Sequence, residues 1–268
     1  MPYRYFDAHC HVQFDAYDRD RDALIARMKA EEVAGVVVGC DLESSRKAVE
    51  LAERHEHLVA SIGLHPNRAE HEQFDISNYR VLAQRKKVVA IGECGLDYYR
   101  PAEVNDEIKK NQKAILKDQI ALAAELDKPL IIHSRPSKGT MDAYKDLVQI
   151  LREAKAKHAN LRGDIHFFVG TPEIAQELLE LGFTISFTAV ITFARDYDEV
   201  IKMAPLNKIL SETDSPYVPP TNRSRGSRND PLAVMDVVSK IAEIRGEDPE
   251  TVCTAVFNNA RRLFTLPF

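Results

Sequence analysis

Cysteine is scarce in this sequence, and long apolar runs are absent from it. Only four of the 268 residues are cysteines, and these are widely scattered: Cys10, Cys40, Cys94 and Cys253. So few cysteines exclude a disulfide framework and predict reduced thiols, as in a cytoplasmic protein. No apolar stretch approaches the roughly 20 residues of a membrane helix, and charged residues follow directly after the N-terminus. We therefore expect neither a membrane span nor a targeting segment.

An excess of positive charge is also missing, since the formal net charge is −5. This balance argues against a surface that coats nucleic acid by bulk electrostatics, although it permits a local basic site. With 44% hydrophobic and 29% charged residues, the composition excludes disordered, collagenous and coiled-coil proteins. No repeat, low-complexity tract or proline-rich linker divides the chain, and we expect a single domain over residues 1–268.

Short apolar runs rich in β-branched residues alternate with segments of helical spacing. The predicted strands cover residues 3–8, 33–39, 58–64, 88–92, 129–132, 163–168, 183–187 and 207–211. The clearest helix is predicted over 105–126, with Ile108, Ile115 and Leu122 on one stripe. This alternation fits a closed (β/α)8 TIM barrel or an open doubly wound sheet. The barrel is favoured because the first strand ends in histidines, not in the glycine-rich turn of dinucleotide-binding folds.

Histidines and carboxylates gather at the ends of the predicted strands. His9 and His11 are separated by one residue, so strand alternation directs both imidazoles to one side. Later strands add further members: His65, Glu93, His133, His166 and Asp214. Because all strand C-termini meet at one face of a barrel, these residues are expected to form one cluster there. The remaining histidines are interpreted as solvated surface residues: His55, His57, His71 and His158.

A cluster of imidazoles and carboxylates is typical of a metal site. A catalytic ion usually takes three protein ligands, so this many candidates predict two divalent ions. Glu93 is the best bridging candidate because each of its oxygens can bind one ion. For His65, a hydrogen bond to a carboxylate explains the residue as well as ligation does. The histidine-rich set suits Zn²⁺ or Mn²⁺ better than Mg²⁺.

Arginines are predicted at the same barrel mouth. Arg135 follows the fifth strand, and the loop after the last strand carries Arg223, Arg225 and Arg228. Arginine forks match phosphate oxygens, and loops after late strands of barrels often bind phosphate. The alternative for this loop is a solvated, flexible segment.

One further feature of the predicted mouth leaves alternatives open. Tyr98, Tyr99 and Arg100 either form a stacking surface for a base or only close the barrel rim.

The cysteines are predicted to take no part in the chemistry. Strand alternation turns Cys10 and Cys94 away from the cluster, and nothing in the sequence near Cys40 makes that thiol a nucleophile.

The chain resembles the TatD-related deoxyribonucleases, which are metal-dependent hydrolases of the amidohydrolase superfamily. The resemblance rests on motifs that occur in order: DAHCH at 7–11, GLHP at 63–66, GECGLDYY at 92–99, KPLIIHSR at 128–135, HFFVG at 166–170, ETDSPYV at 212–218 and RNDP at 228–231. It implies a distorted TIM barrel with a binuclear divalent-metal site whose ligands match His9, His11, Glu93, His133, His166 and Asp214. It also implies that His65 lies near the substrate phosphate.

The chain departs from the family pattern at two places. Members commonly carry an aspartate where this sequence has Gln13, and commonly read HCFSG where Phe167 and Val169 stand here. The first change affects the support of the first metal pair, and the second removes a thiol and a hydroxyl near strand 6. Glu93 on the fourth strand, in place of a carboxylated lysine, favours the TatD branch of the superfamily.

The expected function is phosphodiester hydrolysis of DNA by a 3′-5′ exonuclease that acts on single-stranded or frayed ends. Glu93 and Asp214 are the expected catalytic residues, with Asp214 accepting or orienting the proton of a water. DNA ends are the expected partner of a monomer that needs no protein partner and no membrane. The first alternative is a hydrolase of a small-molecule C–N, ester or lactone bond with the same metals. The second is a metal-binding regulatory or scaffold protein.

Overall fold

Eight parallel strands form one sheet in the order β1 to β8, as the alternation predicts. The structure, a computed structural model, describes residues 3–69, 72–100, 104–224 and 226–266. The strands are β1 (Tyr5–Cys10), β2 (Val33–Val38), β3 (Leu58–Ile62), β4 (Val88–Asp97), β5 (Leu130–Arg135), β6 (Gly163–Ile165), β7 (Thr184–Phe187) and β8 (Ile209–Ser211). Each strand pairs in parallel with the next one.

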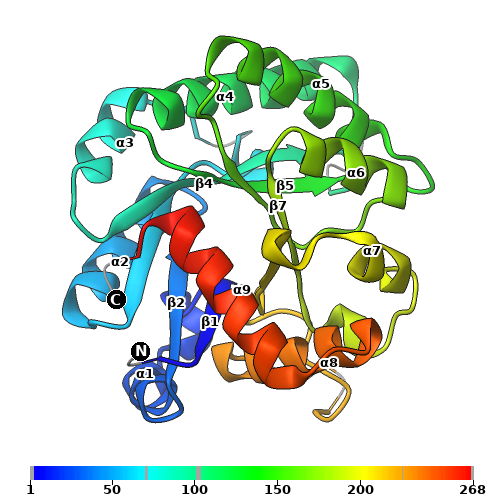
Figure 1. Cartoon of the computed structure of the whole chain (residues 1–268). Coiled ribbons are helices and arrows are strands. Elements are labelled where there is room, and N and C mark those ends of the chain that lie inside the picture. The colour runs from blue at the N-terminus through cyan, green and yellow to red at the C-terminus, as the bar shows by residue number, and fades with distance from the viewer. Residues whose placement is uncertain (1–2, 70–71, 101–103, 225, 267–268) are drawn as a thin grey trace.

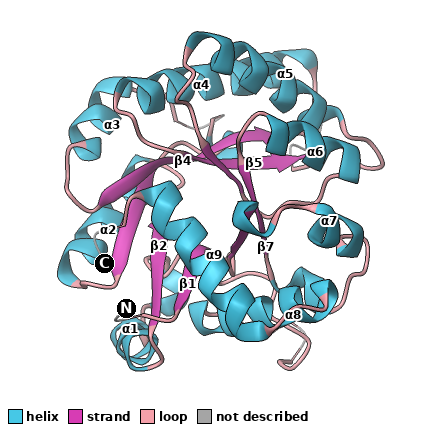
Figure 2. Ribbon diagram, viewed as in Figure 1, coloured by secondary structure: helices cyan, strands magenta, loops and turns pink. Residues whose placement is uncertain are grey.

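Helices follow the strands in turn and surround the sheet (Figures 1 and 2). They are α1 (Arg21–Ala30), α2 (Leu42–Arg54), α3 (Ile76–Ala83), α4 (Asp106–Glu125), α5 (Asp142–Lys157), α6 (Pro172–Glu180), α7 (Asp198–Met203), α8 (Val234–Arg245) and α9 (Pro249–Phe264). The (β/α)8 TIM barrel is therefore confirmed. Within the described residues, no helix has both the length and the apolar character that crossing a membrane requires.

The barrel closes between β8 and β1 just beyond the end of β8. The backbone N–H of Asp214 donates to the carbonyl of His9 at 2.9 Å, and that of His11 donates to the carbonyl of Ser215 at 2.8 Å. These bonds place Asp214 beside both histidines of the first strand. Closure of the barrel and assembly of the predicted cluster thus depend on the same backbone contacts.

The opposite end of the barrel is filled by apolar side chains. A buried cluster joins inward-facing strand residues to the last helix: Phe6, Val36, Val59 and Ile131 pack with Phe257, Leu263 and Phe264. Figure 1 shows α9 crossing in front of the strands at this end. Polar residues are therefore concentrated at the other end, where the strands terminate.

Two glycines allow β4 to pass close to β5. Gly92 has φ 142° and Gly95 has φ 141°, values that side chains rarely permit. A Cβ on Gly95 would lie 1.9 Å from the carbonyl oxygen of His133. The glycines of the GECGLD motif thus allow Glu93 and His133 to lie on adjacent strands.

The long helix α4 matches the predicted range within one residue at each end, but its buried face differs from the predicted stripe. Ile108 and Ile115 are only partly buried, whereas Gln112 and Gln119 are buried. Each glutamine forms two hydrogen bonds with one stretch of strand-end backbone, Gln112 at Asp97 and Gln119 at Leu64. Full satisfaction of their polar atoms allows these side chains to replace apolar ones.

The surface interpretation of the four remaining histidines is correct for His158 and wrong for His57. His57 is buried directly before β3, and neither ring nitrogen has a hydrogen-bond partner among the residues described. Desolvation lowers its pKa to about 4. His55 is half-buried, and His71 lies outside the described residues.

Candidate metal centre

The six predicted metal ligands come together at the C-terminal ends of the strands, beside a cavity of about 770 Å³. β1 carries His9, β4 carries Glu93 and β5 carries His133, while His11, His166 and Asp214 follow the ends of β1, β6 and β8. The strands extend further than predicted, so Glu93 and His133 lie inside β4 and β5. His166, in contrast, lies one residue beyond the short strand β6.

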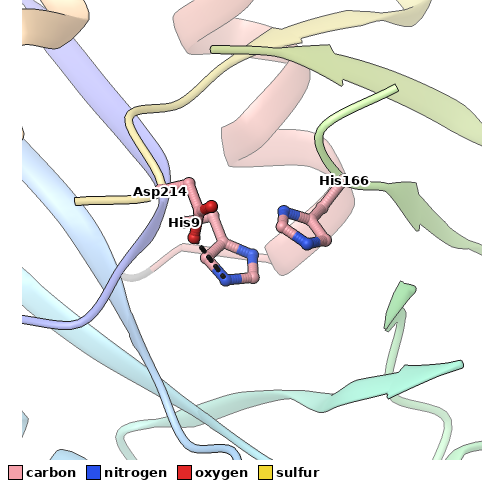
Figure 3. A group of neighbouring side chains, drawn as sticks. All are labelled: His9, His166 and Asp214. Atoms are coloured by element: carbon pink, nitrogen blue, oxygen red, sulfur yellow. Dashed lines mark ion pairs between the residues drawn. The ribbon is translucent and has the colours of Figure 1, made fainter. Parts of the chain in front are cut away.

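His9, His11 and Asp214 form the first of two groups. Nε2 of His9 lies 3.1 Å from Nε2 of His11, and Nε2 of His11 lies 3.4 Å from Oδ1 of Asp214. The same aspartate oxygen is 3.8 Å from Nε2 of His9 (Figure 3). Nδ1 of His11 donates to the carbonyl of Val38 at 2.8 Å, so the lone pair of its Nε2 is free to bind an ion.

Three further histidines surround one oxygen of Glu93. Its Oε1 atom lies 3.0 Å from Nε2 of His166, 3.1 Å from Nδ1 of His133 and 3.2 Å from Nε2 of His65. Its Oε2 atom faces the first group, 3.5 Å from Nε2 of His9. The two oxygens of Glu93 therefore face two different groups of imidazoles, which is the arrangement of a bridging ligand.

The local electrostatics keep the central carboxylates ionised. Burial opposes ionisation of Glu93, but the surrounding imidazoles, His65 and His166 first among them, hold the pKa of Glu93 well below its usual range. Burial likewise opposes ionisation of Asp214, yet its contact with the imidazole of His11 lowers the pKa of Asp214. Burial lowers the pKa of His9, which favours the neutral imidazole that binds metals.

Two buried carboxylates behind the cluster orient its histidines. Oε2 of Glu212 lies 3.1 Å from Nδ1 of His166, and Oδ2 of Asp97 lies 3.1 Å from Nε2 of His133. Each carboxylate holds the proton on one ring nitrogen and leaves the other nitrogen free for a metal. Neither role is among those predicted from the sequence. For Asp97, strand alternation was an available signal. It lies four residues after Glu93 on β4, and alternation places such residues on the same side of a strand.

The donor set fits divalent metal ions. In three groups, each residue offers one possible ligand atom, and these atoms lie within 4.8 Å of one another: His9, His166 and Asp214 (Figure 3), His9, His11 and Glu93, and His65, Glu93 and His133. Imidazole nitrogens with free lone pairs, combined with ionised carboxylates, are ligands that zinc and manganese accept. Nδ1 of His9 also lacks a hydrogen-bond partner within the described part of the chain, so no neighbour fixes which of its nitrogens carries the proton.

Comparison with known families identifies the chain. The family described as TatD related DNase matches residues 6–265. The chain belongs to this family. Its catalytic class is therefore that of a metal-dependent hydrolase, and the resemblance inferred from the motifs is confirmed.

Relatives of the chain within the TatD family include proteins with and without a named activity. It is 38% identical over 265 residues to the uncharacterized metal-dependent hydrolase YabD of Bacillus subtilis, covering 97% of this chain and 99% of that protein. It is 32% identical over 270 residues to a protein of Pantoea ananatis named 3′-5′ ssDNA/RNA exonuclease TatD, with 97% and 99% covered. The solved structure of YjjV, a TatD homologue from Escherichia coli, has a TM-score of 0.88 at 29% identity and covers all of both chains.

In this TatD family member, His65 is oriented as a hydrogen-bond donor. Its Nδ1 atom accepts from the backbone N–H of Asn67 at 3.0 Å, so the proton is on Nε2, which points at Glu93. Burial lowers the pKa of His65, which keeps the ring neutral. Of the two interpretations of His65, this geometry favours hydrogen bonding over ligation.

Gln13, where TatD proteins commonly have aspartate, supports the first histidine pair. Its Nε2 donates to the carbonyl of Val38 at 2.7 Å, and the same oxygen accepts from Nδ1 of His11. A carboxylate in this position would repel the carbonyl oxygen that the amide now contacts. Gln13 and His11 are therefore coupled through one backbone acceptor.

The other sequence departure from the TatD pattern shapes the cavity wall. Phe167 has φ 48°, in the left-handed region, and its backbone N–H donates to Glu212. Phe167 and Val169 both line the cavity. An apolar wall thus stands beside His166 where family members commonly have a thiol and a hydroxyl.

The structure does not bring the two described arginines of the loop after β8, Arg223 and Arg228, to the cavity. Arg223 forms an ion pair with Asp230 at 3.0 Å, and Arg228 forms a two-bond pair with Asp20. Neither residue lines the cavity. Arg225 lies outside the described residues.

Other arginines do line the cavity. Arg135 lies there as predicted, with its guanidinium 4.1 Å from the ring centroid of Tyr99. Arg68 and Arg100 also border it, and the sequence analysis assigned a phosphate role to neither. Tyr98 is buried and so offers no stacking face, whereas Tyr99 is 50% exposed.

The cysteines behave as predicted. Cys10 and Cys94 face away from the cluster and donate to backbone carbonyls. Cys40 borders the cavity with Sγ 3.5 Å from Oε2 of Glu93. Burial and the charge of Glu93 raise the pKa of Cys40 well above its usual value, so it remains a thiol and not a nucleophilic thiolate.

Proposed function

We propose that this protein hydrolyses phosphodiester bonds of DNA as a 3′-5′ exonuclease on single-stranded or frayed ends. Two divalent ions would be held by His9, His11, Glu93, His133, His166 and Asp214. The observation that carries the proposal is the position of Glu93, whose Oε2 faces His9 at 3.5 Å while its Oε1 faces His166 at 3.0 Å. Paired ions are typical of enzymes that displace groups at phosphorus.

Each part of the chemistry has a residue suited to it. Divalent ions supply Lewis-acid chemistry: they polarise a phosphoryl oxygen and lower the pKa of water. Asp214 is ionised, borders the cavity and is 14% exposed at its side chain, so its carboxylate can accept the proton of the attacking water. His65 can turn its Nε2–H from Glu93 to a phosphate oxygen. Arg135 supplies positive charge at the rim.

The proposed 3′-5′ direction of degradation and the proposed substrate rest on similarity to a named relative. The relative from Pantoea ananatis is named as a 3′-5′ exonuclease on single-stranded DNA and RNA, and the two chains align over nearly their full lengths. A cavity at a barrel mouth admits a chain end more readily than an intact duplex. We further propose a cytoplasmic monomer, in agreement with four buried cysteines that form no disulfide.

Product sizing on labelled DNA tests this function. A single-stranded oligonucleotide labelled at its 5′ end is incubated with the protein and Mn²⁺, Mg²⁺ or Zn²⁺. We expect a ladder of products that shortens from the 3′ end, and loss of that ladder in Glu93→Ala and Asp214→Ala. Wild-type rates in both variants would refute the proposal, and so would an inactive metal-replete protein. In the second case, hydrolysis of a small-molecule amide, ester or lactone becomes the leading alternative.

A further inference from the structure

The wall of the cavity is divided into two chemically different halves. Arginines occupy the loops after three consecutive strands, with Arg68 after β3, Arg100 after β4 and Arg135 at the end of β5. Aromatic rings occupy the loops on the other side, after β6, β7, β8 and β1: Phe167, Tyr197, Tyr217 and Phe14. Because the strands follow one another around the barrel in chain order, the two sets lie on opposite sides of the metal cluster.

Two of the arginines are free to bind an anion. Within the part of the chain that the structure describes, no carboxylate forms an ion pair with Arg100 or Arg135, whereas Arg68 has Asp41 at 3.6 Å. Arg135 is held over the ring of Tyr99, which fixes its guanidinium at the rim without neutralising it. An unpaired guanidinium beside a cavity suits the oxygens of a phosphate.

The aromatic side offers exposed ring faces close to the metal ligands. Tyr217 is 49% exposed, and its ring centroid lies 6.3 Å from that of His11. Phe14 stacks on His11 with centroids 4.5 Å apart and an interplanar angle of 6°. The half-exposed ring of Tyr217, beside the metal ligands, is suited to stacking on the planar face of a base.

We propose that the cavity holds the end of a nucleic acid strand across the metal cluster. The phosphate next to the scissile one binds Arg100 and Arg135, and the terminal base stacks against Tyr217. A nucleic acid strand is divided in the same way as the cavity wall, since its phosphates and its bases project to different sides of its backbone. The inference rests on the proposed phosphodiesterase function and names the contacts that select a strand with at least two phosphates.

The phosphate contacts are tested with substrates that differ by one phosphate. The dinucleotide TpT has only the scissile phosphate, and the trinucleotide TpTpT has a neighbouring one. We expect the wild-type protein to have a kcat/KM for TpTpT at least about tenfold above that for TpT. Arg100→Gln and Arg135→Gln should each remove most of this preference. Arg152→Gln, which removes the same charge from α5, where Arg152 pairs with Glu177, should retain it.

A binding measurement gives a readout that is independent of turnover. Fluorescence anisotropy of a labelled TpTpT with metal-free protein, titrated at several salt concentrations, reports the number of phosphate contacts. Each of Arg100→Gln and Arg135→Gln should weaken binding and reduce the salt dependence by about one contact. If both variants bind and cleave like Arg152→Gln, the phosphate subsite is refuted.

The base contact is tested by removing the base. A dinucleotide with an abasic 3′-terminal unit should be cleaved at least about fivefold less efficiently than TpT by the wild type. Tyr217→Ala should remove this difference, while Tyr217→Phe, which retains the ring, should preserve it. An unchanged difference in Tyr217→Ala would overturn the stacking role.

These results separate the two proposals. The small diester bis(p-nitrophenyl) phosphate has no nucleobase and no second phosphate, so its hydrolysis requires neither a terminal base nor the neighbouring phosphate contact. A protein that cleaves it but shows no preference for TpTpT or for a terminal base would retain the phosphodiesterase function and lose the subsites. A protein that cleaves no phosphodiester with any of the three metals would lose both.

Discussion

Oε1 of Glu93 lies 3.0 Å from Nε2 of His166, although the two residues are 73 positions apart, with Glu93 inside β4 and His166 directly after β6. The same histidine directs its Nδ1 to the buried carboxylate of Glu212 at 3.1 Å. His166 is therefore fixed between one carboxylate that would share a metal with it and another that sets its protonation.

The first prediction concerns the proton on His166. Glu212→Gln replaces an acceptor by an amide that can present its NH₂ group to Nδ1, which would move the proton to Nε2 and block the metal-binding lone pair. We expect divalent-metal affinity, measured by competition with a chelator, to fall by about 10- to 100-fold. Ser186→Ala is the control because Ser186 contacts Glu212 without contacting His166. Equal losses in both variants would contradict this account.

A second prediction concerns Asp97 and His133. Oδ2 of Asp97 accepts hydrogen bonds from His133 and from the side-chain amide of Asn67. In Asp97→Asn, an NH₂ group placed at this position would face two donors and could accept from neither. We expect a loss of metal affinity of about 10-fold or more, measured by the same chelator competition. The control is Asp146→Asn, which removes a charge from α5, where Asp146 accepts a hydrogen bond from the hydroxyl of Tyr98. This variant should leave the metal affinity unchanged. Wild-type affinity in Asp97→Asn would show that His133 needs no such partner.

The third prediction is a pH dependence of stability. Desolvation lowers the pKa of buried His57 to about 4, while the pKa of a histidine in an unfolded chain is about 6.5. As pH falls from about 6.5 to 4, the unfolded chain binds a proton that the folded chain does not, so folding stability decreases over this window.

His57→Phe should remove this contribution. The free energy of unfolding of the variant, from urea titrations at pH 7 and pH 4.5, should fall by roughly 2 kcal/mol less than that of the wild type between the two pH values. His158→Phe, at an exposed position, should behave like the wild type. Parallel pH profiles for all three proteins would show that His57 does not couple folding to pH.

Local signals were sufficient to predict the barrel and the clustering of the six candidate ligands. Each strand has a short β-branched run, and the barrel brings all strand ends to one face, so His9 and Asp214 could be predicted to meet although 205 positions separate them in the sequence. The extra length of β4 and β5 was not predictable from apolar runs, because Glu93 and His133 are polar residues inside strands.

The positions that were predicted wrongly belong to polar residues whose partners lie on other elements of the fold. Arg228 was predicted at the mouth because its loop follows the last strand, but its partner Asp20 is 208 positions away. Gln112 was left off the buried face of α4 because its two hydrogen bonds go to the backbone of Asp97 on another element. In both cases the position of a polar side chain is decided by a partner that sequence periodicity does not identify.

Metal titration during turnover tests the central claim, that Glu93 joins two ions in a phosphodiesterase site. Metal-free wild-type protein is titrated with Mn²⁺ or Zn²⁺ while bound metal and hydrolysis of bis(p-nitrophenyl) phosphate are measured in the same samples. The account predicts that activity reaches its plateau at two bound ions per chain, and that Glu93→Gln neither binds two ions at these concentrations nor approaches the wild-type rate. Full activity with one ion or with none, or wild-type behaviour of Glu93→Gln, would contradict it.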